Sequence, residues 1–305
     1  MKTQTYRFCV CGLWIMSVFI SVSLYYSSYL IPSQIRNKEY VSGTLYKNSL
    51  YGSMHRKSQQ LQSSDSYLST DKHFVSKITQ WGNQNLLNRT SNPKYKAFDR
   101  RITDREFNMF MDLFEVFMST CEANNITYLL LGGTLLGSYR HMGMILWDDD
   151  FDVLVNNRHK TKVKHTFESL EVEGITLNLH THNMWKIYSE QDSNDKHWPF
   201  LDIFFFEKNG THFWTTEEFK EGYRYIPYHD VFPLRRHPFY KFLPFIPRRP
   251  EQVLNIAGGF DIHDCKTNYY SHKNESYVSG TVSVRCSELY SYFPFVINNE
   301  LHFPE

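Results

Sequence analysis

The chain has 305 residues, of which 41% are hydrophobic and 17% aromatic, and its net charge at neutral pH is +1. This length suffices for one or two domains with buried cores. The small net charge argues against a broad basic surface, so we expect no nucleic-acid partner. The histidines show no HExxH spacing and the cysteines no CxxC pair, which argues against a zinc site, and no GxSxG elbow indicates a serine hydrolase.

The N-terminal segment is long and apolar enough to cross a bilayer. Phe8–Ile31 contains no charged residue, and as a helix it would measure about 36 Å, against about 30 Å for a hydrocarbon core. Lys2 and Arg7 precede it, which favours a cytoplasmic N-terminus. We therefore predict a cytoplasmic tail over residues 1–7 and a transmembrane signal anchor over residues 8–31. A cleaved signal peptide is the alternative.

The chain after this anchor has the character of a luminal protein. Residues 32–93 are rich in Ser, Gln, Asn and Lys without sustained periodicity, which predicts a stem. Residues 94–305 form the predicted luminal catalytic domain. Four Asn-x-Ser/Thr sequons follow the anchor, and we expect glycosylation at Asn88 and Asn209. Together these features predict a single-pass type II protein of the Golgi or endoplasmic reticulum membrane.

The luminal domain is expected to begin with an amphipathic helix. Thr103 and Glu106 form a capping box, and apolar residues recur at helical spacing from Phe107 to Cys121. An apolar face of this kind more commonly packs in a core than binds a ligand.

A strand and a glycine turn come next. Tyr128–Leu131 is a short apolar run that ends at Gly132 and Gly133, which predicts a buried strand entering a tight turn. The glycines would allow a ligand to approach the backbone closely. Thr134 is expected to cap a short helix, Leu135–Arg140, whose amino end would face a phosphate group.

Acidic residues follow at the spacing of one strand face. Side chains alternate between faces along a strand, so Asp148, Asp150 and Asp152 are predicted to project together. Clustered carboxylates raise one another's pKa unless a cation compensates. Oxygen ligands favour Mg²⁺ or Mn²⁺, commonly shared with a substrate diphosphate. A helix cap or a Ca²⁺-stabilised loop at 148–150 is the alternative interpretation.

The remaining elements indicate helices mixed with a small sheet. We expect a helix over 158–170, strands over 175–179 and 184–188, and a hairpin from Phe200–Phe206 and Thr211–Trp214. This pattern predicts an α+β (α/β-like) domain.

One charged residue interrupts the apolar strand Phe200–Phe206. An ionised Asp202 in such a run needs a partner. If this strand lies beside the one that carries Asp150 and Asp152, the three carboxylates form one cluster. Asp202 would then serve as a metal ligand or as a general base.

Two cysteines lie near the C-terminal end. Cys265 and Cys286 can form a disulfide in an oxidising lumen, although the sequence alone does not fix the distance between them. Cys121 falls on the predicted helix and is expected to be a core residue.

The glycine turn and the acidic residues together resemble the LicD and fukutin-related family. Residues 132–153 read GGTLLGSYRHMGMILWDDDFDV, which is similar to the family pattern GGTLLGxxRxxxxIPWDDDxDV. Further matches are LDIF at 201–204 and VFPL at 231–234. The resemblance extends from about Thr103 to Gly259. It departs from the family at Leu146, where a proline is usual, and at 257–259, where relatives have a tyrosine-glycine pair.

The resemblance implies a nucleotidyltransferase-like fold and the transfer of a phospho-alcohol, such as phosphocholine or an alditol phosphate, from a CDP-linked donor to a glycan. In this reading, Mg²⁺ or Mn²⁺ is held by three catalytic carboxylates, and the nucleotide phosphates contact the glycine turn. The predicted ligands are Asp150, Asp152 and Asp202, and the predicted substrate-binding residues are Gly132, Gly133, Thr134, Arg140, Asp148 and Asp149.

Some alternatives remain open from the sequence. Arg140 could hold a donor phosphate or pair with an aspartate of the cluster. The protein could instead be a luminal family member that no longer catalyses and binds a glycosyltransferase. A third possibility keeps the fold and transfers a nucleotidyl or mannosyl-phosphate group.

Overall fold

The computed structural model describes residues 92–170, 174–190, 193–217, 225–258, 260–290 and 292–293. The described residues belong to one compact unit. The predicted cytoplasmic tail, membrane anchor and Asn88, together with all but the last two residues of the predicted stem, lie outside them. Among the described residues, no helix has the length and apolar character needed to cross a membrane.

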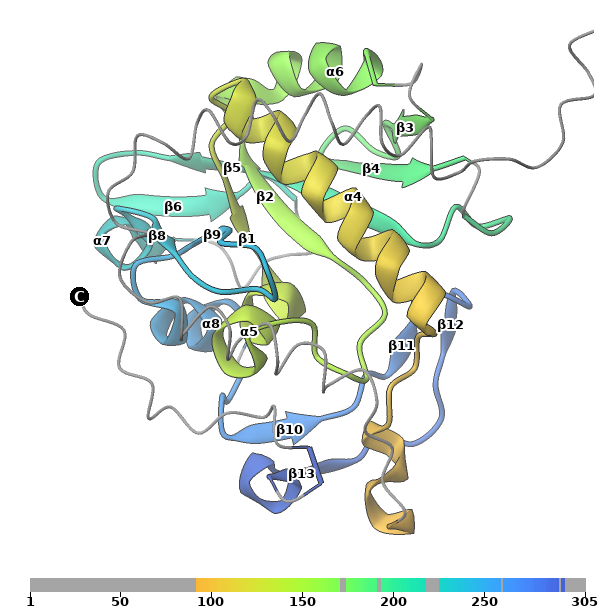
Figure 1. Ribbon diagram of the computed structural model, residues 1–305. Coiled ribbons are helices and arrows are strands. Elements are labelled where there is room, and N and C mark those ends of the chain that lie inside the picture. The colour runs from red at the N-terminus through yellow and green to blue at the C-terminus, as the bar shows by residue number, and fades with distance from the viewer. Residues whose placement is uncertain are drawn as a thin grey trace, which may run out of the picture. The chain divides into compact units, whose positions relative to one another are not determined.

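A mixed sheet forms the centre of the domain (Figure 1). Its strand order is β1-β2-β5-β4-β3, and β6 and β7 extend it from β5. Strands β2 and β5 are parallel, whereas the other neighbours are antiparallel. The predicted combination of a mixed sheet with helices is therefore confirmed. The strands are β1 (Tyr128–Leu130), β2 (Asp152–Asn156), β3 (Ile175–Asn178), β4 (Met184–Ser189), β5 (Phe200–Lys208), β6 (His212–Thr215) and β7 (Ile226–Pro227).

Helices accompany this sheet, and the longest of them, α4, crosses one face of it (Figure 1). The predicted capping box at its start is present, because Thr103 Oγ1 accepts from the Glu106 amide and the Glu106 carboxylate accepts from the Thr103 amide. The helices are η2 (Pro93–Phe98), α4 (Asp104–Ala123), α5 (Gly132–His141), η3 (Asn157–His159), α6 (Lys160–Glu168), α7 (Tyr228–Val231), α8 (Pro250–Gly258) and η6 (Cys286–Leu289).

The aromatic face of α4 packs into the core, as its spacing predicted. Phe110 and Phe114 are buried, and their rings lie 5.4 and 5.2 Å from that of Phe151, just before β2. Phe110 also contacts Trp198, whose indole nitrogen donates to the Asp149 carbonyl. These contacts fix the acidic segment 148–151 against α4.

Two element boundaries differ from the sequence prediction. Helix α5 begins at Gly132, not at Leu135, and its N-cap residue is Leu131, which provides no side-chain cap. Strand β2 begins at Asp152, so Asp148 to Phe151 form a loop before it. Thr134 does not cap the helix, because its hydroxyl accepts from the Asp152 amide at 2.9 Å and ties the helix to the strand.

The C-terminal part of the domain forms small two-stranded pairs. Strand β8 pairs with β9, β10 with β13, and β11 with β12, all antiparallel. We call residues 262–286 the C-terminal strap, and a disulfide between Cys265 and Cys286 closes a loop within it. The strands are β8 (Arg235–Arg236), β9 (Phe245–Ile246), β10 (Asp264–Lys266), β11 (Tyr270–Ser271), β12 (Ser276–Tyr277) and β13 (Ser283–Arg285).

Candidate functional site

Three charged residues form one row across the middle of the sheet. Asp152 on β2 is the register partner of Asp202 on the parallel strand β5, and Asp202 is the register partner of Lys186 on β4. Register partners project to the same face. The Lys186 ammonium lies 3.1 Å from Asp202 Oδ1. The strand adjacency that the sequence analysis assumed is therefore present.

The glycine turn lies directly against two carboxylates. A Cβ added to Gly133 would approach Asp148 Oδ2 to 2.7 Å, and one added to Gly132 would lie 3.4 Å from Asp152 Oδ2. Gly132 also has a φ of +54°, a conformation that glycine adopts without strain. The turn therefore brings the amino end of α5, with its positive dipole end, up to the acidic side chains.

Asp150 lies at the centre of the acidic group. Burial raises its pKa well above the ordinary value, and the carboxylates of Asp148, Asp152 and Asp202 raise it further. Burial likewise raises the pKa of Asp202 to about 6; Lys186 opposes this increase and Asp152 adds to it. Concentrated negative charge of this kind is stabilised by a cation.

Asp149 does not join this group, because the C-terminal strap binds its side chain. The carboxylate accepts from the Ser271 hydroxyl at 2.8 Å and from the amides of His272 and Lys273 at 3.2 Å each. Burial would raise the pKa of Asp149, but these donors and the His272 ring hold it below its usual value. Asp149 thus anchors the acidic loop to the strap.

The strap contributes two residues to the site that the sequence analysis missed. The His272 ring lies between two carboxylates, with Nδ1 3.4 Å from Asp149 Oδ1 and Nε2 3.4 Å from Asp150 Oδ2. Asn268 donates from its side chain to Asp148. Both residues lie at least 120 positions from their partners in the chain, and no motif in the sequence marked them.

Arg140 bonds to the C-terminal strap and not to an aspartate of the acidic loop, and its predicted contact with a donor phosphate stays a prediction. Its guanidinium is buried and donates to the carbonyl of Asp264 at 2.8 Å and to the His141 ring at 2.9 Å. Among the described residues, none of its hydrogen bonds reaches the acidic loop. The side chain lies on the last turn of α5, so it points to the strap instead of the glycine turn at the other end of the helix.

Carboxylate oxygens are the kind of ligand that a hard divalent cation such as Mg²⁺ binds. Asp150 and Asp152 offer oxygen donors, and the buried Asp202 Oδ1 accepts no hydrogen bond from a described residue; the Lys186 ammonium beside it forms an ion pair only. Within the described part of the chain, no group of three or more His, Cys, Asp or Glu side chains is spaced to hold a metal ion. Mg²⁺ commonly takes one or two carboxylates and completes its shell with water and substrate phosphates.

These features define a mixed-sheet domain with a carboxylate site beside a glycine turn. Residues 125–249 match the family model described as LicD/FKTN/FKRP, nucleotidyltransferase domain. The resemblance predicted from the motif is therefore confirmed over this range. The strap lies beyond it.

Two curated relatives are similar to part of the chain. Lipopolysaccharide cholinephosphotransferase LicD of Haemophilus influenzae is 31% identical over 121 residues, which cover 35% of this chain and 46% of the relative. An uncharacterized protein of Rickettsia prowazekii is 28% identical over 153 residues, covering 48% and 53%. The chain thus spans about half the length of these relatives.

A comparison with solved structures gives a distant likeness. Lincomycin-bound lincosamide antibiotic adenylyltransferase LnuA is 18% identical, with a TM-score of 0.30, and the match covers 52% of this chain and 89% of that chain. A likeness this low carries no argument about the present site.

Proposed function

We propose that the protein transfers a phospho-alcohol, such as phosphocholine or an alditol phosphate, from a CDP-linked donor to a glycan hydroxyl. The observation that carries this proposal is the register of Asp152 with Asp202 on parallel strands, with Asp150 two residues upstream and the glycine turn against them. The family match and the relative named as a cholinephosphotransferase support the choice of reaction.

The residues of the chain have separate tasks in this proposal. Asp150 and Asp152 hold Mg²⁺ or Mn²⁺, which when bound neutralises charge on the donor diphosphate. The Gly132–Gly133 turn leaves room for the nucleotide phosphates at the amino end of α5. Asp149 and Thr134 hold the acidic loop and β2 in place through the hydrogen bonds described above.

The chemical step exchanges one phosphate ester for another. The glycan hydroxyl oxygen forms a bond to the phosphorus that carries the alcohol, and the bond from that phosphorus to the bridging oxygen of the diphosphate breaks. CMP leaves with that oxygen. Asp202, held by Lys186 beside Asp152, accepts the proton of the attacking hydroxyl.

The test is CMP release by the full-length chain with CDP-choline, CDP-glycerol or CDP-ribitol, Mn²⁺ or Mg²⁺, and candidate glycans. Asp150→Asn and Asp152→Asn should each reduce turnover at least 100-fold, a loss typical of removing a group that stabilises the transition state. Asp195→Asn is the matched control, because Asp195 is exposed and lies outside the site. Substantial turnover by the Asp150 and Asp152 variants would contradict the proposal.

The same assay distinguishes the proposed transferase from the alternative, a non-catalytic partner of a glycosyltransferase. That role predicts a stable complex with the enzyme and no CMP release with any donor.

The proposed location, anchored in a Golgi or endoplasmic reticulum membrane with a luminal domain, predicts that the chain stays with membranes after carbonate extraction and loses mass on glycosidase treatment. Release by carbonate or an unchanged mass would contradict it.

A further inference from the structure

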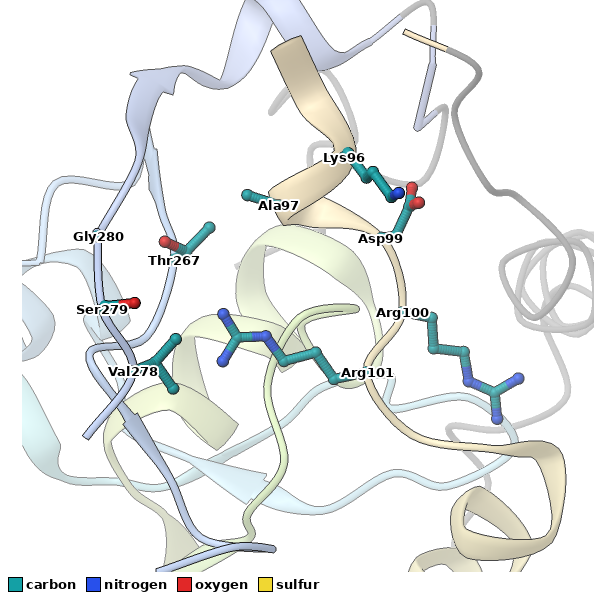
Figure 2. Close-up of a pocket in the computed structure, with 9 residues that line it drawn as sticks. All are labelled: Lys96, Ala97, Asp99, Arg100, Arg101, Thr267, Val278, Ser279 and Gly280. Atoms are coloured by element: carbon teal, nitrogen blue, oxygen red, sulfur yellow. The ribbon is translucent and has the colours of Figure 1, made fainter. Parts of the chain in front are cut away.

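A cavity of about 450 Å³ lies between the N-terminal segment of the domain and the C-terminal strap (Figure 2). Cavities of this size accommodate small-molecule ligands. One wall comes from η2 and the residues after it, and the other from the strap. Its lining residues are Lys96, Ala97, Asp99, Arg100, Arg101, Thr267, Val278, Ser279 and Gly280.

Arg101 is the cationic side chain that reaches across this cavity. Its guanidinium extends toward the strap residues Val278 and Ser279, whereas Arg100 points away from them (Figure 2). Arg100 is already paired with Asp104. Among the described residues, no side chain or carbonyl forms a hydrogen bond or ion pair with the Arg101 guanidinium. A half-buried guanidinium in this state favours an oxyanion that can accept two parallel hydrogen bonds, such as a carboxylate or a phosphate.

The charge around the cavity supports an anionic ligand. Lys96 is a second cationic residue of the lining, although its ammonium points toward Asp99 and away from the Arg101 guanidinium (Figure 2), and Asp99 is the single acidic residue in the lining. The Arg101 backbone is fixed as well, because its amide donates to the Leu146 carbonyl. The guanidinium is therefore attached to the scaffold that also carries the acidic loop.

An exposed aromatic surface adjoins the cavity on the strap. The rings of Tyr269 and Tyr277 are 64% and 80% exposed and stack on each other at 6.2 Å. The amide of Val278, a lining residue, donates to the Tyr269 carbonyl at 2.8 Å. Exposed tyrosine rings offer rigid apolar faces at low entropy cost, which suits the C–H face of a sugar ring.

The cavity is also adjacent to the candidate active site along two stretches of chain. Thr267 lines the cavity, and the next residue, Asn268, donates to Asp148. On the other wall, Arg101 is bonded to Leu146, two residues before Asp148. A sugar chain that is anchored in the cavity therefore has a short path to the carboxylates.

We propose that this cavity and the two tyrosines form a subsite for a saccharide that carries a carboxylate or phosphate group. The oxyanion binds the Arg101 guanidinium, and a sugar ring stacks on the exposed tyrosine pair. This inference rests on the proposed function for its role, because an anionic glycan held here would present a neighbouring hydroxyl to the acidic site.

The test is calorimetric titration of the full-length chain with glucose 6-phosphate, glucuronate, glucose and inorganic phosphate, without any CDP donor. The two anionic sugars should bind at least tenfold more tightly than glucose or inorganic phosphate. Arg101→Gln should weaken their binding at least tenfold. Arg100→Gln is the matched control and should change it less than twofold, since it removes the same charge from a side chain that is already paired.

The tyrosines provide a second, independent arm. Tyr277→Ala should weaken binding of the anionic sugars and leave that of inorganic phosphate unchanged, whereas Tyr225→Ala, at another exposed tyrosine, should affect neither. Equal losses in the two arginine variants, or no saturable binding of either anionic sugar, would overturn the subsite. An unchanged sugar affinity in Tyr277→Ala would overturn the saccharide assignment.

These outcomes are distinct from a failure of the proposed function. In the absence of a glycan, a water molecule takes the place of the glycan hydroxyl and the free phospho-alcohol is released with CMP. This hydrolysis depends on the acidic site alone, so its rate should be the same in Arg101→Gln and the wild type. If this activity and its dependence on Asp150 remain while the titrations fail, the transferase proposal stands and the subsite falls.

Discussion

At the scale of single residues, Gly133 lies so close to the Asp148 carboxylate that a side chain at position 133 has no room. An added Cβ would lie 2.7 Å from Asp148 Oδ2, a distance that requires the carboxylate to move. We expect Gly133→Ala to lower CMP release at least tenfold and to cost about 1–2 kcal/mol of stability, because overpacking outweighs the better helix propensity of alanine.

The control for this change is Gly210→Ala, since nothing lies within 4 Å of a Cβ added there. It should leave both activity and thermal stability near wild type. Wild-type turnover by Gly133→Ala would show that the contact with Asp148 has no part in function.

The acidic cluster also predicts a specific dependence of stability on pH. Burial and three neighbouring carboxylates raise the folded-state pKa of Asp150 above its unfolded value. The folded state therefore binds more protons, so this stability is complete below a pH of about 4 and is lost as the pH rises through the folded pKa. In EDTA, Asp150→Asn should raise the melting temperature at pH 7 and have little effect at pH 4. A lower melting temperature of Asp150→Asn at pH 7 would contradict the predicted electrostatic repulsion among these carboxylates.

His272 is expected to position Asp150. Its Nε2 atom lies 3.4 Å from Asp150 Oδ2, and its Nδ1 atom lies equally close to the anchored Asp149. Removal of groups that orient metal ligands typically weakens metal affinity 10- to 100-fold. We expect His272→Ala to raise the Mn²⁺ concentration for half-maximal CMP release by about this factor. His263→Ala, at an exposed histidine of the same strap, should leave this Mn²⁺ concentration unchanged. An equal shift in both variants would contradict the role of His272 in positioning Asp150.

At the scale of elements, the C-terminal strap holds the acidic loop. The disulfide closes a loop with a sequence separation of 21, which contributes about 3 kcal/mol in the loop-entropy model. Cys286→Ser should lower the melting temperature and weaken Mn²⁺ binding, because Asn268 and His272 lie within that loop. Reducing agent should lower the melting temperature of the wild type and leave that of a double Cys265→Ser, Cys286→Ser variant unchanged. Equal sensitivity of the two proteins would contradict this role.

The elements differ in how far the sequence predicted them. Helix α4, the strands near 175–189 and the hairpin from β5 and β6 follow from local periodicity, and all are present close to their expected bounds. Local patterns succeed where one face is buried along the whole element. The prediction that Thr134 caps α5 was wrong because its hydroxyl bonds to an amide 18 residues away, a contact that no local rule contains.

The sequence likewise predicted some residues of the candidate site and missed others. Asp150, Asp152 and Asp202 were chosen for their spacing and their apolar surroundings, and the sheet places the last two side by side. The roles of Asp149, Asn268 and His272 depend on contacts across about 120 positions between the acidic loop and the strap. Spacing within one segment cannot reveal such contacts.

At the scale of the whole molecule, the proposed transfer depends on a divalent cation bound between the acidic loop and a CDP-linked donor. The strap bonds directly to the loop that carries Asp148 to Asp150, and Trp198, which packs against α4, bonds to the same loop, so several parts of the domain converge on one chemical site. Convergence of this kind is typical of preorganised catalytic sites.

The most direct measurement is a titration of the full-length chain with Mn²⁺, in which electron paramagnetic resonance detects the bound ion, with and without CDP-choline. We expect wild-type protein to bind Mn²⁺ and to bind it more tightly when CDP-choline is present, with Asp195→Asn behaving the same. Asp150→Asn and Asp152→Asn should lose this binding. Unchanged Mn²⁺ affinity in these two variants would contradict the account.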